Sequence, residues 1–169
     1  MLLSKIIEIL DDWCPPNDAE EFDNVGLLIG ELKSEITKAV ITLDITDDII
    51  DECISNGANL IISFHPLFIT DPKTNKMDER INKYIIRCLK NNINVYCIHT
   101  NLDNNPLGTS YQLGKILSLK NQEILVNDEN NNLKGMGSIG SMSHSINDYN
   151  FLEFLKKEVF SRLNFLNEV

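Results

Sequence analysis

The sequence is short of basic side chains and of long apolar runs. Lys and Arg number 15 against 25 Asp and Glu, which gives a formal net charge of −10. Such an acidic chain lacks the positive surface with which proteins bind nucleic acids or anionic membranes, so we expect neither partner. No apolar run approaches the roughly 20 residues that a membrane-spanning helix needs.

Cysteine pairs and targeting signals are also missing. The four cysteines form no C-x-x-C pair, which argues against a zinc ribbon or a redox motif. Three of them lie in apolar patterns typical of reduced core thiols. The amino-terminal segment is acidic at positions where a signal peptide would be apolar or a transit peptide would be Arg-rich. We therefore expect a cytoplasmic protein.

What the sequence does contain is a regular alternation of strand-like and helix-like segments. An amphipathic helix is predicted at 2–13, and a short strand follows at 25–29. Three buried strands and three helices then alternate: strand 39–43, helix 46–56, strand 60–63, helix 78–91, strand 93–98 and helix 110–117. This order predicts an α/β fold with a mainly parallel sheet and flanking helices.

The pattern becomes weaker after residue 119. An Asn-rich loop leads to a predicted glycine-rich strand pair at 133–142, and Ser145 and Asp148 resemble a capping pair for a final apolar helix. We expect residues 1–119 to form the α/β lobe and 120–169 to form the start of a truncated second lobe. The apolar last helix favours a homo-oligomer or another protein partner.

Polar side chains follow the predicted parallel strands at their carboxyl ends. The first buried strand is followed by Asp44, the second by His65, and the third by His99 and Asp103. In an open parallel sheet, ligands bind beyond the carboxyl ends of the strands. Imidazole and carboxylate groups are suitable ligands for zinc, iron or manganese. The alternative is structural: Asp44 caps the next helix and the histidines complete turns.

Four motifs follow one another in the chain: residues 21–30 (EFDNVGLLIG), 43–46 (LDIT), 57–68 (GANLIISFHPLF) and 99–103 (HTNLD), the last followed by Gly108. Together they resemble the GTP cyclohydrolase 1 type 2 family, also called the NIF-three-like family. The resemblance implies an α/β fold with two similar lobes, assembly into rings and a centre that holds two metal ions.

The resemblance also implies the metal ligands. They come from a His-His-Pro motif, from the Asp of a His-Thr-x-x-Asp motif, and from a His and a Glu near the carboxyl terminus. By position, His65 and Asp103 match two of them, with His99 and Asp44 as neighbours that could add one more. The first His of the first motif is replaced by Phe64, which cannot bind a metal.

We expect the last two family ligands to be absent, because the sequence stops at Val169 before the corresponding segment. His144 lies in a different context and does not replace the missing histidine. We therefore predict weak or partial binding of a divalent cation such as zinc, iron or manganese.

Three interpretations of function follow. The first is a metal-binding, hydrolase-like protein with an incomplete site. In the family's proposed reaction a metal-activated water attacks the purine ring of GTP, and we do not expect this polypeptide to catalyse it. The second is a non-catalytic interaction or regulatory module. The third is a truncated product whose missing ligands lie downstream.

Overall fold

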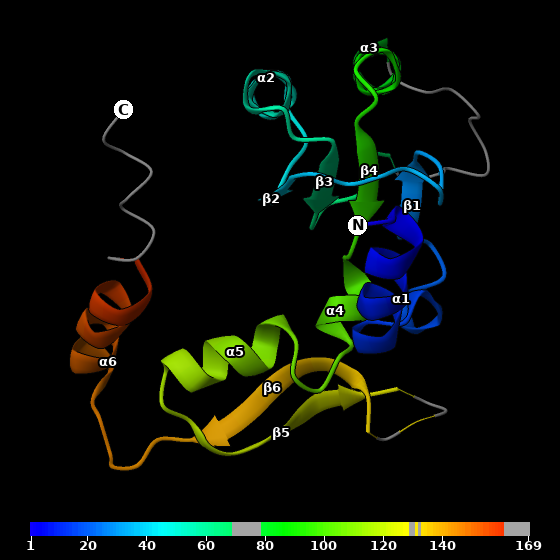
Figure 1. Ribbon diagram of the computed structural model, residues 1–169. Coiled ribbons are helices and arrows are strands. Elements are labelled where there is room, and N and C mark those ends of the chain that lie inside the picture. The colour runs from blue at the N-terminus through cyan, green and yellow to red at the C-terminus, as the bar shows by residue number, and fades with distance from the viewer. Residues whose placement is uncertain (69–78, 129–130, 132, 161–169) are drawn as a thin grey trace. The chain divides into compact units, whose positions relative to one another are not determined.

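The computed structural model describes residues 1–68, 79–128, 131 and 133–160. The chain divides into two compact units, Met1–Leu102 and Asp103–Val169 (Figure 1). The predicted boundary between lobes, after residue 119, falls inside the second unit, and the assignment of lobes stays a prediction.

A four-stranded sheet forms the centre of the first unit. Its order is β1-β4-β3-β2, with β1 (Gly26–Ile29), β2 (Ala39–Thr42), β3 (Leu60–Ser63) and β4 (Asn94–Cys97). Strands β2, β3 and β4 are parallel, which confirms the predicted mainly parallel sheet. Strand β1 runs antiparallel to β4, with its first residue opposite the last residue of β4. The start of β1 therefore lies at the edge where the parallel strands end.

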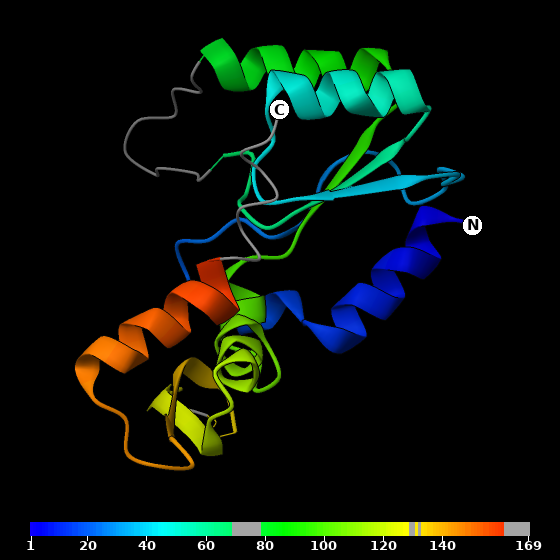
Figure 2. The same cartoon turned by 90° about the vertical axis from the view of Figure 1, so that its left-hand side faces the viewer.

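Helices cover both faces of this sheet. Helices α2 (Asp47–Asn56) and α3 (Glu79–Lys90) lie side by side on one face, and α1 (Leu3–Trp13) lies on the other (Figures 1 and 2). A short 3-10 turn, η1 (Pro16–Asp18), follows α1. The Thr46 hydroxyl accepts a hydrogen bond from the backbone N–H of Ile49, and Gly57 ends α2 with φ of 67°. Both predicted ends of this helix are confirmed. Residue 78, the predicted start of α3, lies outside the described residues.

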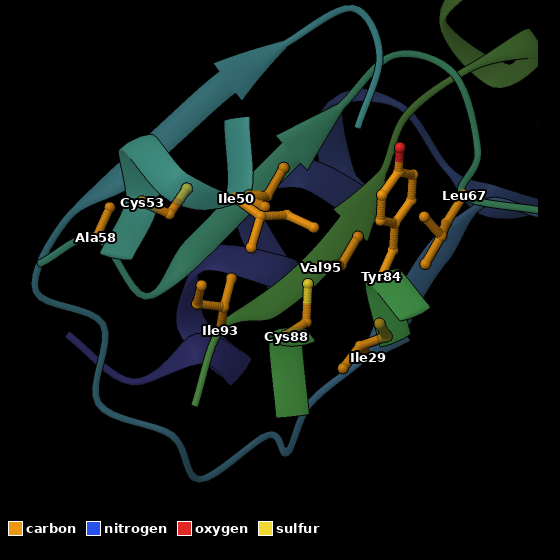
Figure 3. Packing of buried hydrophobic residues seen from close by; sticks show 10 residues of the cluster. Ile29, Ile50, Cys53, Ala58, Leu67, Tyr84, Cys88, Ile93 and Val95 are labelled. Carbon is orange, nitrogen blue, oxygen red and sulfur yellow. The ribbon is translucent and has the colours of Figure 1, made fainter. Parts of the chain in front are cut away.

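Alternate side chains of the central strands enter two separate cores. Ile61 and Val95 face α2 and α3, whereas their neighbours Leu60 and Tyr96 belong to the core on the side of α1. The first core comprises Ile29, Ile50, Cys53, Ala58, Ile61, Leu67, Tyr84, Cys88, Ile93 and Val95 (Figure 3). The second comprises Leu3, Cys14, Ile36, Leu60, Tyr96 and Ile98. The continuous apolar runs at β3 and β4 are thus explained by burial on both faces.

The prediction that residues 39–43 are buried on both faces was wrong. Val40 packs against the core beneath α2 and α3, but Ile41 is 81% exposed and Leu43 is 58% exposed. Strand β2 is at one edge of the sheet, and α1 packs against β1 at the other edge. One face of β2 is therefore left uncovered within this unit.

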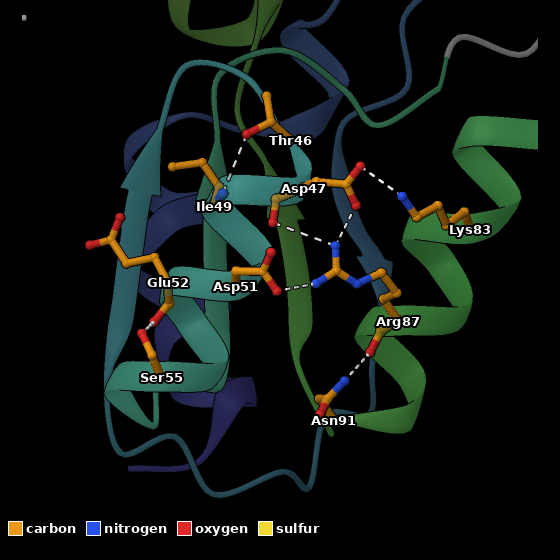
Figure 4. Close-up of polar contacts among 9 residues, drawn as sticks. All are labelled: Thr46, Asp47, Ile49, Asp51, Glu52, Ser55, Lys83, Arg87 and Asn91. Atoms are coloured by element: carbon orange, nitrogen blue, oxygen red, sulfur yellow. Dashed lines mark hydrogen bonds and ion pairs between the residues drawn. The ribbon is translucent and has the colours of Figure 1, made fainter. Parts of the chain in front are cut away.

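Charged side chains join α2 to α3 at the surface (Figure 4). Lys83 Nζ lies 2.8 Å from Oδ2 of Asp47, and the Arg87 guanidinium contacts both Asp47 and Asp51. The hydrogen bond from Lys83 is the largest cause that lowers the pKa of Asp47. Because exposed ion pairs contribute little to stability, the buried apolar side chains dominate the packing of these helices.

The described part of the second unit contains a β-hairpin and three helices. Its elements are α5 (Thr109–Ile116), β5 (Lys120–Asn127), β6 (Gly135–Ser141), α6 (Asp148–Leu155) and η2 (Lys156–Phe160), and Asp103 ends α4 (Thr100–Asp103). Strands β5 and β6 are antiparallel. The strand pair predicted within 133–142 therefore uses 120–127 as its first strand, where a loop had been expected. Most side chains of β5 are exposed, which explains its weak apolar pattern.

The N-cap of helix α6 lies two residues after the predicted one. The side chain of Asn147, and not that of Ser145, accepts the hydrogen bond from the backbone N–H of Asn150, at 2.9 Å. Asn is as good a cap as Ser, so the sequence alone did not separate the two. Among the described residues, no helix has the length and apolar character needed to cross a lipid bilayer.

Replacing Ile50 by Ala tests the core beneath α2 and α3. Ile50 is fully buried, so we expect Ile50→Ala to lower the free energy of unfolding by about 2–5 kcal/mol. Ile54 lies on the same helix and is 43% exposed, so Ile54→Ala should cost about 1 kcal/mol or less. Urea unfolding measures both values. Equal losses in the two variants would contradict this assignment of the core.

Candidate metal centre

The parallel pairing of β2 with β3 brings Asp44 and His65 together. The pairing continues beyond both strands, because the backbone N–H of Phe64 donates to the carbonyl of Thr42 and that of His65 donates to the carbonyl of Leu43. His65 Nδ1 lies 2.6 Å from Oδ1 of Asp44. The two side chains are 45% and 59% exposed, so this pair is open to solvent.

The antiparallel strand β1 brings Asp23 to His99. Asp23 lies three residues before β1, and His99 lies two residues after β4, whose end is opposite the start of β1. His99 Nδ1 lies 2.9 Å from Oδ2 of Asp23. The same oxygen accepts hydrogen bonds from the backbone N–H of Thr100, at 3.1 Å, and from the Thr100 hydroxyl. The Asp23 carboxylate is completely buried.

Asp23 carries a negative charge in spite of this burial. Burial alone would raise the pKa of Asp23, but hydrogen bonds from Thr100, His99 and Asn24 outweigh it and the pKa is lowered from 3.8. An ionised carboxylate can only accept hydrogen bonds, so Nδ1 of His99 must carry the proton that faces it.

Three rings meet at this edge of the sheet. The His65 and His99 ring centroids are 5.5 Å apart, and Phe64 lies 5.2 Å from the first and 5.1 Å from the second. Beneath them, the Cys97 thiol donates to the carbonyl oxygen of Phe64, with the sulfur 3.3 Å from that oxygen. Burial raises the pKa of Cys97 to about 12, so this thiol stays protonated. The cluster therefore offers imidazole nitrogens and carboxylate oxygens, and no thiolate.

Both imidazoles are oriented in the same way. In each, Nδ1 faces a carboxylate, so Nε2 is the ring nitrogen left to face a ligand. Metal-binding histidines are commonly oriented in this way. Phe64 adds no donor atom, and the described residues contain no group of three or more His, Cys, Asp or Glu side chains that could hold a metal. The two imidazoles fit part of the coordination shell of one ion; they do not fit a centre for two.

The four predicted site residues are distributed over the two units. Asp44, His65 and His99 come together in the first unit, as predicted from the strand ends. Asp103 is the first residue of the second unit, where its carboxylate accepts a hydrogen bond from the Thr109 hydroxyl. Its proximity to His65 stays a prediction.

Asp23 is the residue that sequence reasoning missed. It lies in the first of the four motifs, residues 21–30, but no strand ends before it, so the argument from parallel strands could not select it. The antiparallel direction of β1 places it at the site. An acidic residue shortly before a strand that pairs antiparallel at the edge of a parallel sheet is the signal that could have found it.

The lowered pKa of Asp23 predicts a pH dependence of stability. A carboxylate whose pKa is lower in the folded state stabilises that state above its ordinary pKa, and the stabilisation is lost as the pH falls through the folded pKa. We expect Asp23→Asn to lower the melting temperature at pH 7 and to bring it closer to that of the unmodified chain below about pH 4. Thermal unfolding across this range tests it, with Asp12→Asn on the exposed surface as the control. A difference that stays constant with pH would contradict the assigned charge.

The comparison with known proteins shows the family. The model of the family Duf34/NIF3 (NGG1p interacting factor 3) matches residues 1–168. A Clostridium perfringens protein called GTP cyclohydrolase 1 type 2 homolog is 33% identical over 159 residues, which are 94% of this chain and 61% of the relative. A Clostridium acetobutylicum protein of the same name is 38% identical over 120 residues, 71% of this chain and 45% of the relative.

Solved structures agree with this result. The hypothetical protein SA1388 of Staphylococcus aureus has a TM-score of 0.81 at 27% identity, over 94% of this chain and 64% of that one. Reduced HcgD from Methanocaldococcus jannaschii has a TM-score of 0.78 at 33% identity, over 93% and 60%. The chain thus spans less than two thirds of the length of these relatives. The family match and the shared fold together establish that this chain belongs to the Duf34/NIF3 family.

Proposed function

We propose that the chain binds one divalent metal ion through Nε2 of His65 and Nε2 of His99. The observation that carries this proposal is the pair of carboxylate-oriented imidazoles, whose ring centroids are 5.5 Å apart at the carboxyl edge of the sheet. Two histidines that only completed turns would not need separate carboxylates on Nδ1. Zinc, iron and manganese are the ions that such a set of nitrogen and oxygen donors suits.

The two carboxylates have different tasks in this proposal. Buried Asp23 is fixed by Thr100, so it fixes the ring orientation of His99 and keeps the proton on Nδ1. Asp44 does the same for His65 at an exposed position, where solvent weakens the interaction. When bound, a divalent ion would supply a Lewis acid and lower the pKa of a bound water.

A metal-dependent hydrolytic reaction is the second, broader part of this proposal. The relatives are named as homologs of GTP cyclohydrolase 1 type 2, a name that belongs to proteins longer than the matched segment. Asp103 would add an oxygen ligand, as the resemblance implies, and a further ligand must replace what Phe64 lacks. We therefore propose metal binding for these residues, and a metal-dependent hydrolytic reaction only where additional ligands complete the shell.

Metal titration after chelation tests the proposal. Isothermal titration calorimetry with Zn²⁺ and with Mn²⁺ should give at most one ion per chain. We expect His65→Ala and His99→Ala to abolish measurable binding, and Asp23→Asn and Asp44→Asn to weaken it about 10–100-fold. Weaker metal binding in Asp103→Asn would support Asp103 as the predicted third ligand.

The third histidine provides a matched control. His144 is exposed in the second unit, where its Nδ1 contacts only the neighbouring Ser143 hydroxyl among the described residues. His144→Ala should leave metal affinity unchanged. Equal affinity in His65→Ala and His144→Ala would refute the proposed site, provided that circular dichroism shows both variants folded.

The exposed helix α6 supports a second candidate function, an interaction module. No side chain of α6 is buried, and Tyr149 and Leu152 are 72% and 56% exposed. The Phe151 and Phe154 rings stack with centroids 6.5 Å apart on the same helix. We propose a second copy of the chain as the partner that covers this surface.

Light scattering at micromolar concentration tests the interaction module. We expect a mass at least twice that of one chain, and a shift towards the monomer in Leu152→Lys, because a buried lysine would be desolvated in the interface. Leu133→Lys changes another exposed apolar residue of the second unit and should have no effect. A monomer at all concentrations would remove this candidate.

A further inference from the structure

The Phe64 ring packs against both imidazoles of the candidate metal centre. Its centroid lies 5.2 Å from that of His65 and 5.1 Å from that of His99, with interplanar angles of 56° and 84°. Aromatic pairs favour such tilted and edge-to-face arrangements when their centroids are about 4.5–7 Å apart. Phe64 is therefore in favourable contact with two rings that follow different strands of the sheet.

The position of Phe64 is not explained by either hydrophobic core. Among the described residues, the two cores and the apolar side chains packed against them do not include Phe64, although Phe68, four residues later, packs against the core beneath α2 and α3. An apolar ring stabilises a fold chiefly when it is buried in such a core. The ring contacts that the structure gives Phe64 are those with the two imidazoles, which places its role at the site.

The backbone of Phe64 is fixed on both sides. Its N–H donates to the carbonyl of Thr42, at 3.0 Å, and its carbonyl oxygen accepts a hydrogen bond from the Cys97 thiol, whose sulfur is 3.3 Å away. These contacts connect the residue to β2 on one side and to β4 on the other. The ring thus extends from a rigid piece of backbone, so packing against it can restrict side chains that are less firmly held.

The two imidazoles need such a restriction. Each is held by a carboxylate at one ring nitrogen, and rotation about the Cβ–Cγ bond of histidine is only weakly restricted by itself. His65 is the less firmly held of the two, because its side chain is 45% exposed and its partner Asp44 is exposed as well. A neighbouring ring limits this rotation.

We infer that Phe64 is a positioning residue, which holds the His65 and His99 rings in the orientation that binds the metal ion. It offers the ion no donor atom, and it acts by reducing the ordering of side chains that binding requires. The inference rests on the proposed function, because the ion is the ligand for which the rings are held. We expect a larger effect on His65 than on His99, since His99 is also restricted by its burial, with 17% of its side chain exposed.

Calorimetric titration with Zn²⁺ tests the inference in two variants of Phe64. Phe64→Leu removes the aromatic ring and keeps an apolar side chain, whereas Phe64→Tyr keeps the ring. We expect Phe64→Leu to weaken binding about 2- to 10-fold, because the ion must then order the imidazoles itself. Phe64→Tyr should bind as the unmodified chain does.

Two controls distinguish positioning from a loss of stability. Ile50→Ala weakens the core beneath α2 and α3, and Phe151→Leu makes the same replacement on α6 in the second unit. Neither should change the affinity for Zn²⁺. An equal loss of affinity in Ile50→Ala and Phe64→Leu would show that the effect follows stability, and would overturn the inference.

A second measurement needs no metal ion. Nitrogen NMR spectra of the imidazoles in chelated protein, at a pH where these rings are neutral, show which ring nitrogen carries the proton. In the unmodified chain and in Phe64→Tyr we expect the proton on Nδ1 of both His65 and His99. In Phe64→Leu, His65 should shift towards the form protonated on Nε2, because a ring without this contact leaves Asp44 more often.

The two measurements separate this inference from the metal proposal. If the unmodified chain binds no Zn²⁺, the metal proposal fails, and a proton shift at His65 in Phe64→Leu still supports Phe64 as the residue that holds the ring. An unchanged spectrum of His65 in Phe64→Leu would overturn the inference whether or not the chain binds metal.

Discussion

The candidate site depends on one buried negative charge. Asp23 is completely removed from solvent, and an isolated carboxylate in such a place would be costly. Besides the backbone N–H of Asn24, three donors, the N–H and hydroxyl of Thr100 and the imidazole of His99, stabilise its ionised form. Because the Thr100 and His99 donors come from the segment after β4, the same interaction fixes that segment against the start of β1. The position of one imidazole and the course of the chain around it are therefore set by a single group.

The direction of the strands explains how residues far apart in the sequence come together at the candidate site. Three parallel strands end at one edge of the sheet, and each continues into a polar side chain or an aromatic ring. Because β1 is antiparallel, Asp23, which comes before it, lies at the same edge as the residues that follow the parallel strands. Phe64 does not lie between the two imidazoles, and its ring packs against both. Site chemistry here is a consequence of strand order more than of any local motif.

The sequence predicted the elements of the first unit well because their signals are local and strong. The Thr46 cap, the left-handed Gly57 and the doubly buried β3 and β4 each follow from short-range chemistry. The errors concern relations that no short segment contains. The apolar run that includes Ile41 was expected to be a strand buried on both faces, but it forms the edge strand β2. The polar and mostly exposed residues 120–127 were expected to be a loop, but they pair with β6 as strand β5. Asp23 was missed for the same reason, since strand direction is a property of the whole sheet.

The two carboxylate–imidazole pairs differ in their access to water. The His99 pair is nearly enclosed, with the ring 17% exposed, whereas the His65 pair is open. An enclosed ring has lost most of its rotational freedom during folding, so it needs little further ordering when a partner arrives. The open ring, held by Asp44 at its Nδ1 side, is in contact with solvent over much of its surface. A reagent dissolved in the surrounding water would therefore reach the His65 imidazole far more readily than the His99 imidazole.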